Sequence, residues 1–227
     1  MNWARIKAIT FDAGGTLIEP YPSVGEVYAA VAAEFGFAGL SAAELNRGFA
    51  SAWKQRRAFD YSPSRWKMLV EETFGGPLPG GLFEAIYERF RQPSSWRIWE
   101  DVRPALQTLG ARGYRLAVIS NWDERLRDLL KTLDLSRYLE FIVLSIEAGA
   151  TKPSPLIFQC ALDELKIPAG EVLHIGDSWS EDVEGARACG MAALLLDRRK
   201  TSASSISSLD QLPALLGVPH DQKPSGP

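Results

Sequence analysis

Hydrophobic positions along this chain follow two different periods. Short runs of apolar and β-branched residues, the pattern of buried strands, occur at residues 6–11, 114–119, 141–144, 171–175 and 192–196. Apolar residues at three- and four-residue spacing predict helices at residues 101–112, 123–133, 154–166, 180–188 and 209–216. This alternation predicts an α/β fold with a doubly wound parallel, Rossmann-like sheet and helices on both of its faces.

A long helical segment interrupts the alternation after the first strand. Residues 18–22 contain two prolines, which are excluded from central strands and helix interiors, so this stretch is predicted to be a connector leaving the sheet. Four short amphipathic helices without a strand signal follow it. We therefore predict a core of residues 1–17 and 98–218, an inserted helical cap of residues 18–97 that acts as a lid, and a frayed tail of residues 219–227.

Composition and charge narrow the range of partners. Hydrophobic residues make up 46% of the 227 positions, which is enough for a sizeable core. The formal net charge of −3 argues against sequence-independent nucleic-acid binding, which needs a concentrated positive face. No secretory leader or long apolar span is apparent, and Cys160 and Cys189 fall in predicted helices. We expect a cytoplasmic monomer or homodimer that binds a small molecule and neither nucleic acid nor membrane.

Polar residues suited to catalysis or ligand binding follow the predicted strands. In an open α/β sheet, the carboxyl ends of parallel strands meet at one edge, so these side chains are expected to lie together. Taken singly, each has an ordinary explanation, because Asp, Ser and Asn cap turns and helices and a lysine before proline is usually solvated. The residues are Asp12, Gly14, Ser120, Asn121, Lys152, Asp177 and Asp182.

Several carboxylates at one sheet edge require compensation. Without a cation they would repel one another, and one of them would have to take a proton or remain in water. A hard divalent ion resolves this conflict, and oxygen ligands suit Mg²⁺. A lysine beside a nucleophilic carboxylate would offset its charge and that of a phosphate group.

These stretches together resemble the motifs of the haloacid dehalogenase-like hydrolase superfamily. Residues 11–17, Phe-Asp-Ala-Gly-Gly-Thr-Leu, are similar to its first motif, and Ser120 stands where its second motif ends in Ser or Thr. Lys152 begins a Lys-Pro-x-Pro segment similar to the third motif, and Gly-Asp-x-x-x-x-Asp at residues 176–182 resembles the phosphatase form of the fourth. Residues 115–121 are most similar to the branch called haloacid dehalogenase-like hydrolase domain-containing protein 3.

The resemblance implies a role for each residue. Asp12 would be the nucleophile, while Ser120, Asn121 and Lys152 would bind the transferred phosphoryl group. Asp12, the backbone carbonyl of Gly14 and Asp177 would bind Mg²⁺, with Asp182 assisting.

Gly14 departs from the superfamily pattern. Phosphatases of the superfamily carry a second aspartate there, which protonates the leaving oxygen, and dehalogenases carry a tyrosine. Loss of a general acid typically costs roughly 10²- to 10⁴-fold in rate. A replacement could come from Glu19, from the cap or from the substrate.

Three functions are consistent with the sequence. The first is a Mg²⁺-dependent phosphatase that forms an aspartyl-phosphate at Asp12. The second is a hydrolase without a leaving-group acid, either a dehalogenase or a phosphonate-cleaving enzyme that would use a cap lysine such as Lys54. The third is a fold retained for binding, with its site lost at Gly14. Trp122 and Trp179 follow two motif strands and are expected at the pocket mouth or in core–cap packing.

Overall fold

A five-stranded parallel sheet forms the centre of the core. The computed structural model describes residues 3–56, 59–200 and 205–217, so the predicted tail 219–227 lies outside the described residues. The strands stand in the order β5-β4-β1-β6-β7. Their bounds are Ala8–Phe11 (β1), Arg115–Ser120 (β4), Phe141–Leu144 (β5), Val172–Gly176 (β6) and Ala192–Leu195 (β7). The chain builds outward from β1 to β5, then returns to the other side of β1, which places a crevice beyond the carboxyl end of β1.

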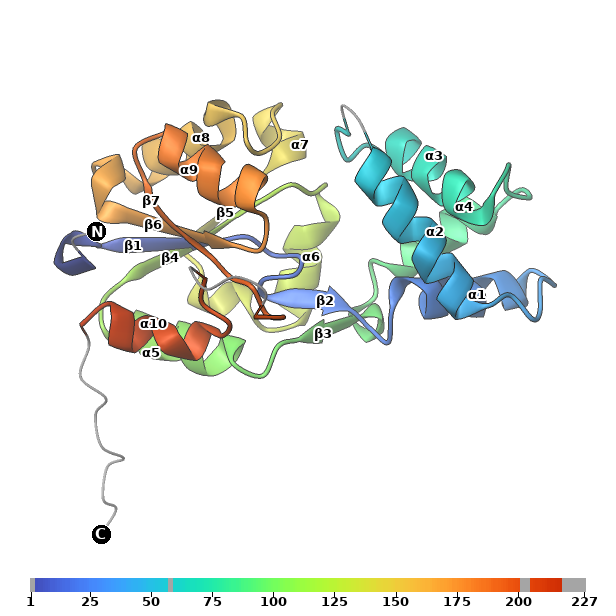
Figure 1. Ribbon diagram of the computed structural model, residues 1–227, viewed down its shortest axis with the longest axis horizontal. Coiled ribbons are helices and arrows are strands. Elements are labelled where there is room, and N and C mark those ends of the chain that lie inside the picture. Colours follow the sequence, from blue (N-terminus) through green and yellow to red (C-terminus); the bar gives the residue numbers. More distant parts are fainter. Residues whose placement is uncertain (1–2, 57–58, 201–204, 218–227) are drawn as a thin grey trace, which may run out of the picture.

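Helices cover both faces of the sheet, as the sequence predicts (Figure 1). One face packs against α5 (Val102–Ala111), α6 (Arg125–Thr132) and α10 (Leu212–Leu215). The other packs against α8 (Pro155–Leu165) and α9 (Gly185–Ala188), while a short helix, α7 (Ser145–Ala148), follows β5 and has no sequence prediction. Within β1, Ile9 and Phe11 face the first layer and Ala8 the second, which is the two-residue period of a strand.

The predicted helical insertion forms a separate bundle beside the core (Figure 1). Its helices are α1 (Val24–Glu34), α2 (Ala42–Gln55), α3 (Pro63–Phe74) and α4 (Leu82–Arg89). Side chains such as Tyr28, Val31 and Ile86 are buried in a hydrophobic cluster of its own. Among the described residues, no helix has both the length and the apolar character needed to cross a bilayer.

The sequence predicts a connector at residues 18–22 and no strand in the insertion, and the structure differs from this at both ends of the insertion. Ile18–Pro20 forms strand β2 and Trp96–Ile98 forms β3, and these strands pair antiparallel with Ile18 opposite Ile98 and Pro20 opposite Trp96. The prolines do exclude this stretch from the central sheet, but a two-stranded ribbon consists of edges only, where proline is tolerated. The core and the bundle are therefore joined by a ribbon, which lies between them in Figure 1.

Candidate active site

Asp12 lies directly after β1, where a tight loop turns the chain away from the sheet. Its backbone N–H donates to the carbonyl of Ile175 on β6 at 2.8 Å, which fixes the start of the loop. The Ala13 carbonyl accepts from the N–H groups of Leu17 and Ile18 at 2.8 and 3.0 Å. Gly15 has a φ of +76°, and a Cβ there would lie 2.4 Å from an oxygen of Asp177. Glycine is therefore required where the loop passes the second carboxylate.

Two of the predicted site residues converge on one oxygen of Asp12. The Oδ1 atom of Asp12 accepts from Ser120 Oγ at 2.9 Å and from Lys152 Nζ at 2.7 Å. The same ammonium group donates to Asp182 Oδ1 at 2.6 Å, so one buried lysine bridges two buried carboxylates. The structure thus brings together the ends of β1 and β4 and the loop before α8.

Asn121 fixes the backbone of Lys152. Its Oδ1 accepts from the Lys152 N–H at 2.6 Å, and its Nδ2 donates to the Lys152 carbonyl at 3.1 Å and to Glu181 Oε2 at 3.2 Å. These contacts position the lysine, while the Asn121 side chain also lines the pocket described below.

Asp182 is held by partners on every side. It lies in a π-helical turn, Trp179–Glu184, which occupies the first half of the predicted helix 180–188. Its Oδ2 accepts from the Ser178 N–H at 2.9 Å, and its Oδ1 lies 3.1 Å from His174 Nε2. A Cβ on Gly176 would lie 2.1 Å from the Asp182 carboxyl carbon, so this approach requires glycine.

His174 is a site residue that sequence reasoning missed. It is fully buried on β6, and its Nδ1 lies 2.9 Å from Thr10 Oγ1. Burial lowers the pKa of His174, so it links Thr10 to Asp182 as a neutral imidazole. The available signal was a single histidine within an otherwise apolar strand, which does not name its partner.

The carboxylates have contrasting electrostatics. Burial raises the pKa of Asp12, although the ammonium of Lys152 partly offsets this. Partial desolvation, together with the charges of Asp12 and Asp182, raises the pKa of Asp177 to about 7, although its side chain is exposed. Burial alone would raise the pKa of Asp182, but Lys152 and His174 lower it. Burial alone would also lower the pKa of Lys152, but the two carboxylates raise it.

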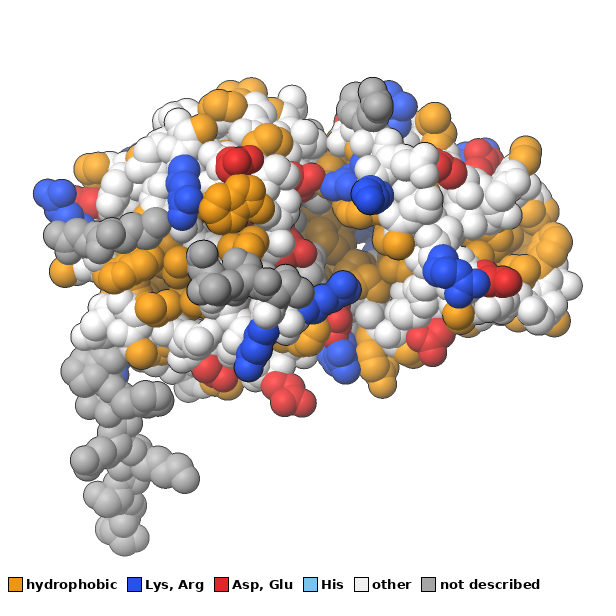
Figure 2. All heavy atoms as spheres, in the orientation of Figure 1, with side chains coloured by type: hydrophobic (Ala, Val, Ile, Leu, Met, Phe, Trp, Pro, Cys, Tyr) orange, Lys and Arg blue, Asp and Glu red, His pale blue; other side chains and the backbone are white. Residues whose placement is uncertain are grey.

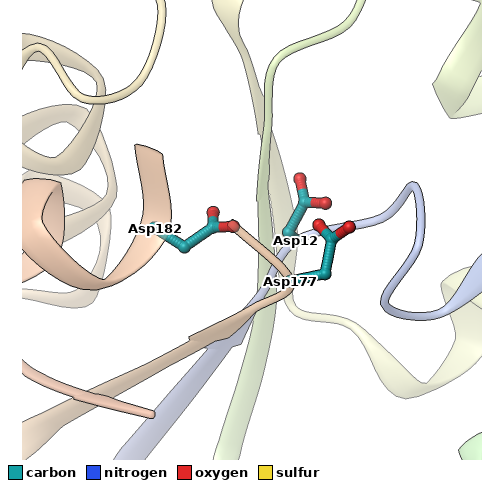
Figure 3. A group of neighbouring side chains, drawn as sticks. All are labelled: Asp12, Asp177 and Asp182. Atoms are coloured by element: carbon teal, nitrogen blue, oxygen red, sulfur yellow. The ribbon is translucent and has the colours of Figure 1, made fainter. Parts of the chain in front are cut away.

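These residues suit a hard divalent cation. Oxygens of Asp12, Asp177 and Asp182 all lie within 4.8 Å of one another, and Figure 3 shows Asp12 and Asp177 side by side with Asp182 pointing toward them. The Asp177 side chain is exposed and has no hydrogen bond or ion pair with another described side chain, so it is open to a ligand from the cavity side. A donor set made of clustered carboxylate oxygens is what Mg²⁺ prefers.

A cavity of about 510 Å³ lies above the carboxylates, between the core and the cap. Figure 2 shows it as a hollow between the two lobes, with hydrophobic side chains inside. Aromatic residues of the cap and of the ribbon form most of the cavity wall opposite the carboxylates. They are Tyr28, Phe49, Trp53, Tyr61, Trp66, Phe83, Tyr87, Phe90 and Trp96.

Arg56 is a second pocket residue that sequence reasoning missed. It stands at the C-terminal end of α2, with its guanidinium 3.7 Å from the centre of the Trp53 ring. It also donates to Glu181 Oε1 at 2.9 Å, so it connects the cap with the core. Lys54, two residues earlier, is exposed and is not among the residues lining the cavity. The hypothesis of an imine-forming Lys54 is therefore wrong.

The structure argues against Glu19 as the substitute for an acid at Gly14. Glu19 is paired with Arg97 on the ribbon, away from the cavity wall. Gly14 itself lines the cavity, and a Cβ there would lie 3.1 Å from Trp122 Cζ3. Trp122 packs against Trp96 with ring centres 5.1 Å apart, which agrees with its expected place in the packing between core and cap. Trp179 is instead 48% exposed and does not line the cavity.

Comparisons with known proteins agree with this architecture. Residues 6–190 match the family model described as haloacid dehalogenase-like hydrolase. The haloacid dehalogenase-like hydrolase domain-containing protein 3 of Danio rerio is 31% identical, with 93% of this chain and 96% of that protein covered. A HAD phosphatase from Thermococcus onnurineus is 27% identical at a TM-score of 0.71, with 93% and 98% of the two chains covered. A 2-haloacid dehalogenase from Pseudomonas syringae, 24% identical at a TM-score of 0.69 and with the same coverage, shares the fold.

Proposed function

The chain belongs to the haloacid dehalogenase-like hydrolase family, and we propose that within this family it is a Mg²⁺-dependent phosphatase of a small phosphate ester. The observation that carries this proposal is the cluster of Asp12, Asp177 and Asp182, whose oxygens lie within 4.8 Å of one another while Lys152 pairs with only two of them. A haloacid dehalogenase reaction needs no metal, so it gives no reason to place a third carboxylate beside Asp12 and Asp182.

The chain's own residues account for phosphoryl transfer. The free oxygen of Asp12 attacks phosphorus, while Ser120 and Lys152 hold Oδ1 and fix the carboxylate plane. Lys152 also neutralises part of the charge that accumulates when a carboxylate meets a phosphate dianion. Asp182, held by His174 and the Ser178 N–H, keeps the ammonium in place from the other side.

Mg²⁺ would be held by Asp12, Asp177 and the backbone carbonyl of Gly14, with Asp182 in support. When bound, it would supply positive charge that offsets the phosphate oxygens in the transition state.

Phosphate release from a panel of phosphorylated metabolites tests this proposal, with Mg²⁺ or with excess chelator. We expect release only with the metal, and expect Asp12→Asn to abolish it because the nucleophile's charge is lost at nearly constant shape. Asp128→Asn, an exposed aspartate on α6, is the matched control and should behave as wild type. Turnover that survives in Asp12→Asn or in chelator contradicts the proposal.

The same preparations test the dehalogenase alternative. The feature that favours it is the lack of an acid at Gly14, because a departing halide needs no proton. Chloride release from 2-chloropropionate in the presence of chelator would support it, and its absence beside metal-dependent phosphate release would exclude it.

A further inference from the structure

We propose that the substrate is an aryl phosphate, in which an uncharged aromatic ring bonded through a phenolic oxygen is the leaving group. This inference rests on the proposed phosphatase function and specifies its substrate class. It follows from three features of the cavity: its aromatic wall, its charge balance and the surroundings of Gly14.

The wall that faces the leaving group is aromatic. In-line transfer places the leaving oxygen opposite the attacking Asp12, which directs the rest of the substrate away from the sheet and into the cap. There the rings of Phe49, Trp53 and Trp66 form a stack, with Trp53 at 5.8 Å and 16° from each of the other two. A polyol would have to desolvate its hydroxyl groups against this wall, where the Trp66 indole N–H is one unpaired donor, whereas a planar ring gains contact with the wall.

The charges in this part of the cavity are already balanced. Arg56 pairs with Glu181, and Arg125 pairs with Asp123 through Nε and Nη2 at 2.8 and 2.7 Å. Arg125 also donates to the Tyr87 carbonyl at 2.8 Å. Both guanidinium groups that line the cavity are thus committed, so a second anionic group on the substrate finds no free cation among the described residues.

Among the described acids that line the cavity, none stands free to protonate the leaving oxygen. Trp122 covers the space where a side chain at residue 14 would begin. Among the other described acids lining the cavity, Glu181 is bound by Arg56 and Asn121, and Asp177 belongs to the proposed metal site. A leaving group that departs as a stable anion meets this condition, and a phenolate does so far better than an alkoxide.

The step balances without an acid in the site. Asp12 forms a bond to phosphorus, the bond between phosphorus and the phenolic oxygen breaks, and its electron pair leaves as phenolate. Water then attacks the phosphorus of the aspartyl-phosphate, Asp12 departs as carboxylate, and both hydrogens of the water remain on the released dihydrogen phosphate.

The test compares three substrates that differ in two properties of the leaving group, namely whether it contains an aromatic ring and how readily it departs as an anion. 1-Naphthyl phosphate carries both features, acetyl phosphate has a good leaving group without a ring, and glucose 6-phosphate has neither. We expect kcat/KM for 1-naphthyl phosphate to exceed that for glucose 6-phosphate by about 100-fold or more, the usual effect of a missing general acid. Acetyl phosphate should show a comparable kcat with a higher KM.

One variant and a matched control test the contribution of the aromatic wall. Trp53→Leu should raise KM for 1-naphthyl phosphate by about tenfold, the scale of an aromatic contact, and KM for acetyl phosphate by less. Phe37→Ala, an exposed aromatic position in the same cap, should leave both values unchanged. Binding of 1-naphthyl phosphate to Asp12→Asn, followed by tryptophan fluorescence, reports the contact without turnover.

The outcomes distinguish the two proposals. Hydrolysis of glucose 6-phosphate as efficient as that of 1-naphthyl phosphate overturns the aryl inference and leaves the phosphatase assignment standing. Absence of 1-naphthyl phosphate binding at millimolar concentration also overturns the inference. If none of the three compounds and no metabolite phosphate is hydrolysed with Mg²⁺, the phosphatase function itself fails, and the inference fails with it.

Discussion

Replacing Lys152 by methionine tests the electrostatic design of the site. The ammonium lies 2.7 Å from Asp12 and 2.6 Å from Asp182, and all three side chains are largely buried. Each attraction is worth about 6 kcal/mol at an effective dielectric constant of about 20. Desolvation of the three groups offsets most of the sum, and removing one partner of a buried ion pair costs about 3–5 kcal/mol of folding free energy.

The cost should depend on pH with a defined sign. In the wild type, the lowered pKa of Asp182 contributes stability that is present above the unfolded value of about 3.9 and is lost as pH falls through the folded value. Without Lys152, the folded pKa of Asp12, which is already raised, rises further, and that of Asp182 rises above the unfolded value. The free energy of unfolding of the variant then falls as pH rises from about 4 through the folded pKa values of these two groups. The deficit of Lys152→Met is therefore largest at pH 8 and smaller by about 1 kcal/mol or more at pH 5.

Urea unfolding followed by tryptophan fluorescence in chelator measures this deficit at both pH values. Lys54→Met is the matched control, because Lys54 is exposed on α2, and it should change stability by less than about 0.5 kcal/mol. A Lys152→Met protein within about 1 kcal/mol of wild type at pH 8, or a deficit independent of pH, would refute the reasoning.

Three further predictions concern the glycines, the metal and the cap. Gly176→Ala places a Cβ 2.1 Å from the Asp182 carboxyl carbon and should lower the free energy of unfolding by about 1–3 kcal/mol in a urea titration. As the control, Gly110→Ala places a Cβ 4.0 Å from its nearest neighbour and should be neutral or stabilising. At a hundredfold excess over its Kd, Mg²⁺ should add about 2.7 kcal/mol to the free energy of unfolding and so raise the melting temperature. In calorimetry, Asp177→Asn should lose most of that rise in melting temperature. Arg56→Gln breaks the 2.9 Å pair between cap and core, so steady-state kinetics should show a raised KM while unfolding free energy changes by less than about 1 kcal/mol.

The site could be located from sequence because its members follow strands. Asp12, Ser120 and Asp177 each come directly after a buried apolar run, and parallel pairing of β4, β1 and β6 then brings them to one edge. Lys152 requires the family resemblance, because its loop precedes a helix and its own sequence pattern is that of a solvated turn. The distances to Asp12 and Asp182 agree with that assignment.

Other parts of the site depend on contacts that no local pattern encodes. Arg56 reaches Glu181 only because the whole bundle stands over the core, and helix periodicity does not specify that placement. The pairing of β2 with β3 joins segments of three residues that are separated by the entire cap, so neither shows a strand signal. The partner of His174 follows from the π-helical turn that points Asp182 at it, a geometry without a sequence signature.

The ribbon of β2 and β3 makes the position of the core independent of which segment is inserted as the cap. Because Pro20 and Trp96 lie opposite each other, the chain leaves and re-enters the core at neighbouring points, whatever is inserted between them. A longer insertion adds only about 0.6 kcal/mol of closure entropy for each doubling of its length. A different insertion can therefore replace the aromatic wall of the cavity while the carboxylates at the sheet edge, and the glycines that admit them, keep their places.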